Sequence, residues 1–218
     1  MKTKQFLGMV AVLSLAAFAL PAQADTLDSK VKEIIKRDFR DKGIIKATAV
    51  DQDELQAMCS KYLDNVPDEL RNKLEAEQMK GIPKDPSYNH ITASAGTYMG
   101  DWKAGETLAQ SGRGKTWTDK ADDAAGGNCY NCHQLSATEI AYGTIGPSLL
   151  HYGKIRGDSV DMQRATYARI YNMKAFSACA NMPRFGHMGI LTDTQIKNLV
   201  ALLLHKESPV NKEADVLK

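Results

Sequence analysis

One stretch of five residues limits the possible folds and functions of this chain more than any other: Cys129-Tyr130-Asn131-Cys132-His133. The pattern C-x-x-C-H is the attachment signature of a c-type haem: each cysteine adds to a vinyl group, and the histidine becomes the proximal iron ligand. A zinc site would need a second ligand pair at suitable spacing, and a thioredoxin-like dithiol would need a βαβ setting. Neither accompanies the motif. The sequence therefore predicts one covalently bound haem c, held by Cys129 and Cys132 with His133 on the iron.

The N-terminus has the pattern of a secretory signal peptide. A basic start at Met1–Lys4 precedes an apolar run, Phe6–Leu20, and Ala22-Gln23-Ala24 forms a cleavage site. The run is short for a membrane-spanning helix and stops at Pro21. No cysteine lies at the cleavage point, which argues against a lipid anchor. We therefore predict a cleaved signal over residues 1–24 and a periplasmic mature chain without a membrane segment.

The charge balance gives no reason to expect a polyanionic partner. The sequence has 28 basic and 26 acidic side chains, and two of the basic ones, Lys2 and Lys4, leave with the signal peptide. The mature chain is therefore neutral before the haem propionates are counted. Neither nucleic acid nor an anionic membrane is a predicted partner.

Cys59 and Cys179 are the two cysteines outside the haem motif. An oxidising compartment favours a disulfide between them. Cys59 lies on an apolar helical stripe, so we expect it to face packed structure. The alternatives are two buried thiols, or a role for Cys179 at the haem, because sequence spacing alone does not show whether the two cysteines can meet.

Apolar residues recur at helical spacing along the chain, and no alternating strand pattern of useful length is present, so the chain is predicted to be all-α. We expect a helical N-terminal extension at residues 25–81, a linker at 82–100, the haem-bearing domain at 101–206 and a C-terminal tail at 207–218. Gly105 is expected to allow close approach of another helix. Predicted helix starts are Asp51 with Glu54, Pro67, Asp101, Ser159 (to Ala175) and Thr192 with Gln195.

Pro147 is the predicted partner of the proximal histidine. It lies in a Gly-Pro turn that cannot continue a helix, and it lacks an N–H while keeping its carbonyl. A haem-ligating histidine needs an acceptor for its Nδ1–H, which orients the ring. An ordinary tight turn is the alternative reading of this segment.

Met182 is the predicted distal ligand, because it precedes Pro183 and a residue before proline is held extended. Methionine and histidine together would close both axial sites and suit electron transfer, whereas an open site would suit peroxidase or gas-binding chemistry. His187 is the second choice, and Cys179 would supply a thiolate. Methionines are more often core filler, which is the expectation for Met162 and Met173. The remaining downstream candidates are His151, Met188 and His205.

A family resemblance of this chain rests on five segments after Asp101, which are Gly127–His133, Gly143–Leu149, Tyr152-Gly153-Lys154, Asn181–His187 and Leu191–Gln195. Together they resemble the SoxX family, the cytochrome c subunit of the SoxAX complex of periplasmic sulfur oxidation. The resemblance implies a class I cytochrome c-like domain over residues 101–206, in which Cys129 and Cys132 bind the haem, His133 is proximal and Met182 distal.

The resemblance also implies a division of labour within a heterodimer. SoxAX acts as an L-cysteine S-thiosulfotransferase that oxidatively couples thiosulfate to a cysteine of the carrier SoxYZ. The catalytic cysteine is expected in the SoxA partner, a dihaem or monohaem cytochrome, so no catalytic residue is expected in this chain. Its haem would relay electrons toward an acceptor cytochrome. The alternatives are a free monohaem periplasmic shuttle, and a haem peroxidase or gas sensor.

Overall fold

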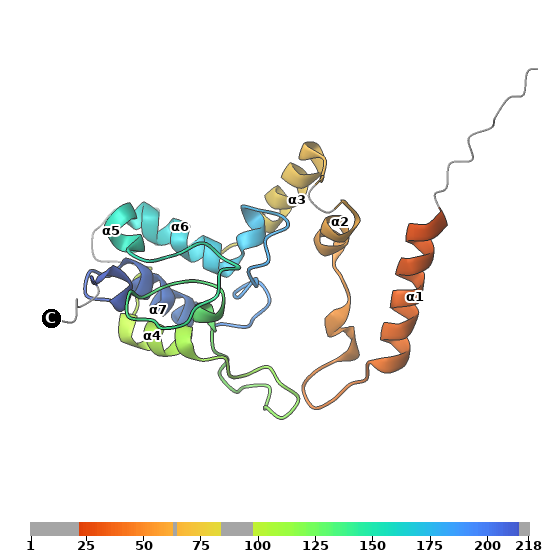
Figure 1. The fold of residues 1–218 in the computed structure, drawn as a ribbon, viewed down its shortest axis with the longest axis horizontal. Helices are drawn as coiled ribbons and strands as arrows, with labels where there is room; N and C mark the ends of the chain where they lie inside the picture. Colours follow the sequence, from red (N-terminus) through yellow and green to blue (C-terminus); the bar gives the residue numbers. More distant parts are fainter. Residues whose placement is uncertain (1–21, 63–64, 84–97, 214–218) are drawn as a thin grey trace, which may run out of the picture. The chain divides into compact units, whose positions relative to one another are not determined.

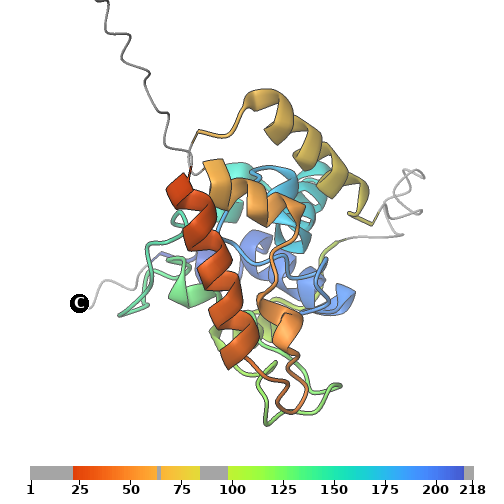
Figure 2. The ribbon, with the colours of Figure 1, turned by 90° about the vertical axis from the view of Figure 1, so that its right-hand side faces the viewer.

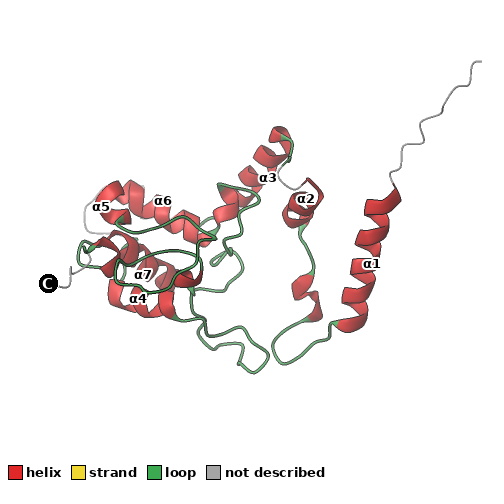
Figure 3. Cartoon of the chain, in the orientation of Figure 1, coloured by secondary structure: helices red, strands yellow, loops and turns green. Residues whose placement is uncertain are grey.

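The computed structural model describes residues 22–62, 65–83 and 98–213, with side chains from residue 29 onward. The chain divides into two compact units, Met1–Arg40 and Asp41–Lys218. Within the described residues every regular element is a helix, apart from one isolated bridge between Lys42 and Ile45 (Figure 3). The all-α prediction is confirmed. None of the described helices combines the length and the apolar character that crossing a membrane requires.

The first unit contains helix α1 (Ala22–Asp38) in its described part. The helix includes Ala24 and therefore runs through the predicted cleavage site. Val31 and Ile34 of this helix are exposed, and so is Phe39 directly after it.

The second unit is built on two crossing helices, α4 (Trp102–Gln110) and α7 (Asp193–Leu204), which lie side by side in both views (Figures 1 and 2). Their backbones meet at Gly105, where an added Cβ would lie 2.2 Å from the carbonyl oxygen of Asn198. Only glycine fits such a contact, as the sequence predicted. The Asn198 side chain accepts the Asp101 N–H at 2.8 Å, and Gly100 N–H donates to the Lys197 carbonyl at 3.0 Å. The start of α4 is thereby fixed to α7.

Helix α7 supplies most of the main core. Thr192 and Gln195 form the predicted capping box at its start, and Ile196, Val200 and Leu202 are completely buried. Burying one side chain of this kind stabilises a fold by about 1.5–3 kcal/mol. Helix α7 can therefore act as the central support of the unit.

Three residues of the segment expected to be a C-terminal tail, Ser208, Val210 and Asn211, are buried against this core. Helix α5 (Tyr152–Arg156) and the short helix η5 (Pro209–Asn211) pack against α7, and Val210 is completely buried. Asn211 accepts the Gly153 N–H at 2.8 Å and donates to the Leu203 carbonyl at 3.0 Å. The Asn211–Gly153 contact joins residues far apart in sequence, and no local sequence pattern predicts it.

Helix α6 (Val160–Tyr171) packs on α7 and is capped by Ser159, as predicted. It ends earlier than the expected Ala175, because Asn172 adopts an extended backbone and caps a separate short helix, η4 (Met173–Ala175).

The predicted extension spans both compact units, because the division falls after Arg40. Helices α2 (Glu54–Tyr62) and α3 (Asp68–Lys80) belong to the second unit, and α3 packs on η4. The cap of α2 differs from the prediction of Asp51 with Glu54. The helix begins at Glu54, so Asp53 is the capping residue: its carboxylate accepts the Gln56 N–H, and the Gln56 side chain accepts the Asp53 N–H.

The two ends of the expected linker at 82–100 are packed. Ile82 and Tyr98 are both buried, and Tyr98 lies against Tyr167 of α6 with ring centroids 5.0 Å apart. Residues 84–97 lie outside the described part of the chain.

An ion pair joins the start of α2 to the segment before α7. Asp53 Oδ2 lies 2.5 Å from Arg184 Nη2, and the Arg184 side chain is only 7 % exposed. Burial opposes ionisation of Asp53, but the Gln56 N–H and the Arg184 guanidinium outweigh it, so the Asp53 pKa is lowered. A lowered pKa means that the ionised carboxylate favours the folded state.

Asp53→Asn should therefore destabilise the protein in a pH-dependent way. Asparagine keeps the helix cap but loses the charge, and we expect a loss of about 1 kcal/mol at pH 7, because Asp53 is itself 40 % exposed. The contribution is complete above the unfolded pKa of about 3.9 and disappears as pH falls through the lower folded value. Urea unfolding across this range measures it. Asp68→Asn, at an exposed pair with Arg71, is the control with no expected loss. An Asp53→Asn difference that stays constant with pH would contradict the assignment.

Gly105→Ala tests the α4–α7 crossing. The new methyl group has no room beside Asn198, so we expect a loss of about 1–3 kcal/mol in the free energy of unfolding, despite the better helix propensity of alanine. The matched control is Gly81→Ala at the end of α3, where φ is −77° and the nearest atom would be 3.4 Å away. That substitution should be neutral or stabilise by up to about 1 kcal/mol. Equal effects at the two glycines would show that the crossing is not close-packed.

Candidate functional site

The C-x-x-C-H segment is anchored on α4. Gly127 N–H donates to the Leu108 carbonyl at 2.9 Å, immediately before the short helix η3 (Cys129–Asn131). Asn128 has a left-handed backbone, with φ at 51°, and turns the chain into that helix. The Tyr130 hydroxyl donates to Glu106 of α4 at 2.8 Å. The motif is therefore held by both its backbone and its second residue.

The Gly143–Leu149 loop is hydrogen-bonded along the motif. Three N–H groups of the loop, from Gly143, Gly146 and Leu149, donate to carbonyls of the motif segment at 2.8–3.0 Å. Their acceptors, in the same order, are Tyr130, Cys132 and Gln134. This register brings Pro147 beside the histidine of the motif.

His133 has the orientation that a proximal ligand needs. Its Nδ1 lies 2.7 Å from the Pro147 carbonyl oxygen, which is the predicted acceptor. Because a carbonyl can only accept, Nδ1 carries the proton and Nε2 keeps its lone pair for a metal. The backbone of Gly146 contacts the imidazole ring closely, because an added Cβ there would lie 2.1 Å from the His133 Cε1 atom. The ring is thus held by a hydrogen bond and by close contact with the turn.

Cys129 and Cys132 are free thiols, in contrast to the other two cysteines of the chain. Burial, with a smaller contribution from Cys132, raises the pKa of the Cys129 thiol to about 12. Reactive C-x-x-C dithiols and thiolate metal sites have lowered pKa values instead. The Cys129 thiol therefore lacks the lowered pKa of a reactive dithiol.

These observations fit a covalently attached haem. The two thiols are available for thioether bonds, and Gly127 leaves space beside Cys129, where an added Cβ would lie 3.1 Å from Sγ. The histidine has a fixed ring and an unprotonated Nε2. This donor set and spacing match what a c-type haem requires.

Glu106 is a half-buried acid beside the motif that sequence reasoning missed. Its Oε1 accepts from Tyr130 and from Gln110, whereas its Oε2 is buried without a partner among the described residues. Burial, with a smaller contribution from Glu139, raises the Glu106 pKa. In the sequence, Glu106 is a single acid on a short amphipathic helix. Such an acid most often points to solvent, so nothing in the sequence marked it as part of the site.

Met182 lies on a different segment and lines a surface pocket of about 330 Å³. Its side chain is partly buried against the main core. The pocket also has Gln56 of α2, Lys174 and Arg184 in its wall, and none of its lining residues belongs to the C-x-x-C-H motif. The described geometry thus brings together Cys129, Cys132, His133 and Pro147, with Met182 in a separate pocket.

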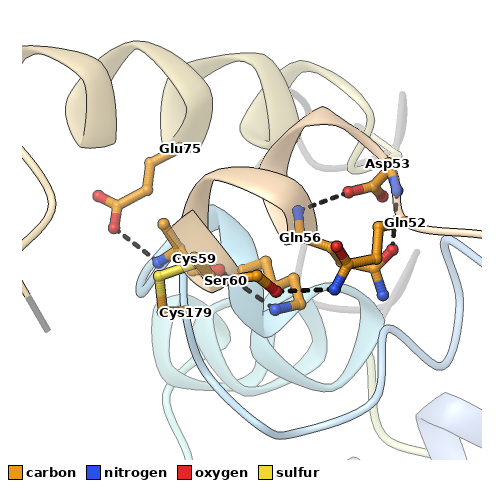
Figure 4. The surroundings of a disulfide bond; sticks show 9 residues. Gln52, Asp53, Gln56, Cys59, Ser60, Glu75 and Cys179 are labelled. Atoms are coloured by element: carbon orange, nitrogen blue, oxygen red, sulfur yellow. Dashed lines mark hydrogen bonds between the residues drawn. A yellow bond between two sulfur atoms is a disulfide. The ribbon is translucent and has the colours of Figure 1, made fainter. Parts of the chain in front are cut away.

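Three of the other ligand candidates, Cys179, Met162 and His205, have partners of their own. Cys179 forms a disulfide with Cys59, so the thiolate alternative is wrong for the oxidised protein (Figure 4). The Tyr152 hydroxyl contacts the Met162 sulfur at 3.9 Å, and His205 stacks on Trp102. Burial and the nearby Arg184 charge lower the pKa of His187, which lies close to the end of α3.

Comparisons with known proteins agree with this site. The Cytochrome c family model matches residues 111–207. An uncharacterized lipoprotein of Aquifex aeolicus (strain VF5) is 37 % identical over 192 residues, which cover 88 % of this chain and 84 % of that protein. The matched region contains the C-x-x-C-H motif, the Pro147 turn and Met182, and the family implies a covalently bound haem c. The chain therefore carries a cytochrome c domain over residues 111–207.

Proposed function

We propose that this chain is the electron-transfer cytochrome c subunit of a SoxAX complex, which joins thiosulfate oxidatively to a cysteine of the SoxYZ carrier in the periplasm. The cytochrome c domain supports the electron-transfer part of the role. The SoxX part rests on the family resemblance over residues 101–206.

The observation that carries the proposal is the hydrogen bond from His133 Nδ1–H to the Pro147 carbonyl. It leaves Nε2 as the iron-binding atom and fixes the orientation of the ring. Cys129 and Cys132 would hold one haem c through thioether bonds, and the haem would supply a one-electron centre. The Gly146 contact keeps the imidazole from rotating away from its acceptor.

Met182 is proposed as the second axial ligand. Its position before Pro183 and its partly buried side chain favour a fixed thioether over a solvent-facing one. A histidine and a methionine would leave no open iron site for substrate, so this chain would move electrons. The transferase chemistry, including the catalytic cysteine, would then reside in a SoxA-like partner.

Export of the chain is part of the proposal. The predicted signal peptide at residues 1–24 supports it, and so does the name of the Aquifex relative, since lipoproteins are exported. The disulfide between Cys59 and Cys179 is also typical of an oxidising compartment.

Met182→Ala tests the axial assignment. The oxidised wild-type holoprotein should show the weak near-infrared band of sulfur-to-iron ligation, and the variant should lose it and have a lower reduction potential. Met162→Ala, which removes a partly buried methionine sulfur from the core, is the matched control and should keep the band. If Met182→Ala retains both the band and the potential, Met182 is not the ligand.

Copurification tests the SoxAX assignment. A tagged holoprotein recovered from periplasm should carry a second cytochrome in fixed stoichiometry, together with thiosulfate-dependent modification of a SoxYZ-type carrier cysteine. Recovery of this chain alone, with electron-transfer activity intact, would favour the free shuttle.

A further inference from the structure

Helices α2 and α3 hold the chain segment that carries Met182. This Met182 segment, residues 172–185, runs from the end of α6 to Phe185 in the main core. The disulfide between Cys59 and Cys179 joins α2 to it three residues before Met182, with the two Cα atoms 5.5 Å apart (Figure 4). A covalent bond therefore limits how far this side of the segment can move.

An apolar cluster surrounds the disulfide. Ala178 is 1 % exposed and packs with Leu55 and Met58 of α2 and Leu74 of α3. The Ala178 N–H donates to Glu75 at 2.8 Å. The segment thus has covalent, apolar and polar contacts with the same two helices.

Arg184 makes the second attachment, two residues after Met182. Its Nη2 pairs with Asp53 at the start of α2, and its Nη1 donates to the Gln78 side chain of α3 at 3.3 Å. Gln78 also accepts from Asn172, which is completely buried, at 2.9 Å. One guanidinium therefore connects the Met182 segment to both helices, and its burial makes loss of these partners costly.

The same contacts shape the surroundings of the thioether. Gln56, from the first turn of α2, and Arg184 both line the pocket that contains Met182. Lys174, also in its wall, donates to the Ala178 carbonyl at 3.2 Å. Met182, Arg184 and the first turn of α2 thus contribute to one pocket wall.

We propose that Arg184 is a positioning residue for Met182, and that α2 and α3 brace the Met182 segment so that the iron resists other ligands. This inference rests on the proposed role of Met182 as axial ligand. A small ligand can reach the iron only after the methionine leaves. With the segment tied before Met182 by Cys179 and after it by Arg184, that departure must break at least one tie. The brace gives the extension a function at the haem.

Imidazole binding to the ferric holoprotein, followed through loss of the near-infrared methionine band, tests the inference. Arg184→Gln should bind imidazole at least about tenfold more tightly than the wild type, equivalent to about 1.4 kcal/mol. Arg184→Lys should lie between the two, because one ammonium group cannot bridge Asp53 and Gln78 as the planar guanidinium does. Lys80→Gln, which removes an exposed ion pair with Glu77 on α3, is the matched control and should leave the affinity unchanged.

A second variant keeps the test decisive if Arg184→Gln does not yield folded holoprotein. Cys59→Ser with Cys179→Ser removes the other tie and should also tighten imidazole binding. Wild-type affinity in either folded variant, even with a lower unfolding midpoint, would overturn the inference and leave the brace a purely structural role. Absence of the methionine band in the wild type would instead reject the axial assignment of Met182.

Discussion

The contact between Gly105 of α4 and the Asn198 carbonyl of α7 is the constraint on which the rest of the second unit depends. It allows two helices to cross at backbone distance, and the buried side of α7 then has a partner along the length of α4. The haem motif follows from α4 through the Gly127–Leu108 hydrogen bond, and α5, α6 and η5 pack on α7. The position of the motif is therefore set by a contact that contains no haem-binding residue. The residues that stabilise the helix crossing are therefore different from the residues that would bind the cofactor.

The proximal His133 and the proposed distal ligand Met182 lie on two segments that are held in place in different ways. The proximal side is rigid through short-range contacts: the loop carrying Pro147 is hydrogen-bonded along the motif, and His133 is enclosed between that carbonyl and Gly146. The Met182 segment also has short-range backbone hydrogen bonds, such as the one from the Ala180 N–H to the Ser177 carbonyl, which stop before Met182 itself. It relies on α2 and α3, through a disulfide and a buried guanidinium, which are contacts made over more than a hundred residues of sequence. A minimal cytochrome domain would lack these contacts, and that difference gives a physical reason for an extension at residues 41–81.

Most of the features that sequence reasoning predicted lie within a few neighbouring residues; the exception is the Cys59–Cys179 disulfide, which rested on the oxidising compartment. The C-x-x-C-H motif, the Thr192–Gln195 capping box and the apolar stripe of α7 are local patterns with one strong structural solution. Gly105 was predictable because glycine in a helix has few other uses. The cap of α2 was placed two residues early, since Asp51 and Asp53 offer the same chemistry and only the true helix start separates them. The Arg184–Asp53 pair, the Glu106–Tyr130 bond and the burial of Asn211 were not predictable, because each depends on which distant segments the fold brings together.

We propose that this chain closes its haem iron with one nitrogen ligand from His133 and one sulfur ligand from Met182. X-ray absorption at the iron edge of the ferric holoprotein measures this directly, since sulfur scatters more strongly and binds at a longer distance than nitrogen. We predict one sulfur atom bound to the iron beside nitrogen ligands, in the wild type at neutral pH. A spectrum that requires only nitrogen and oxygen ligands would contradict the account.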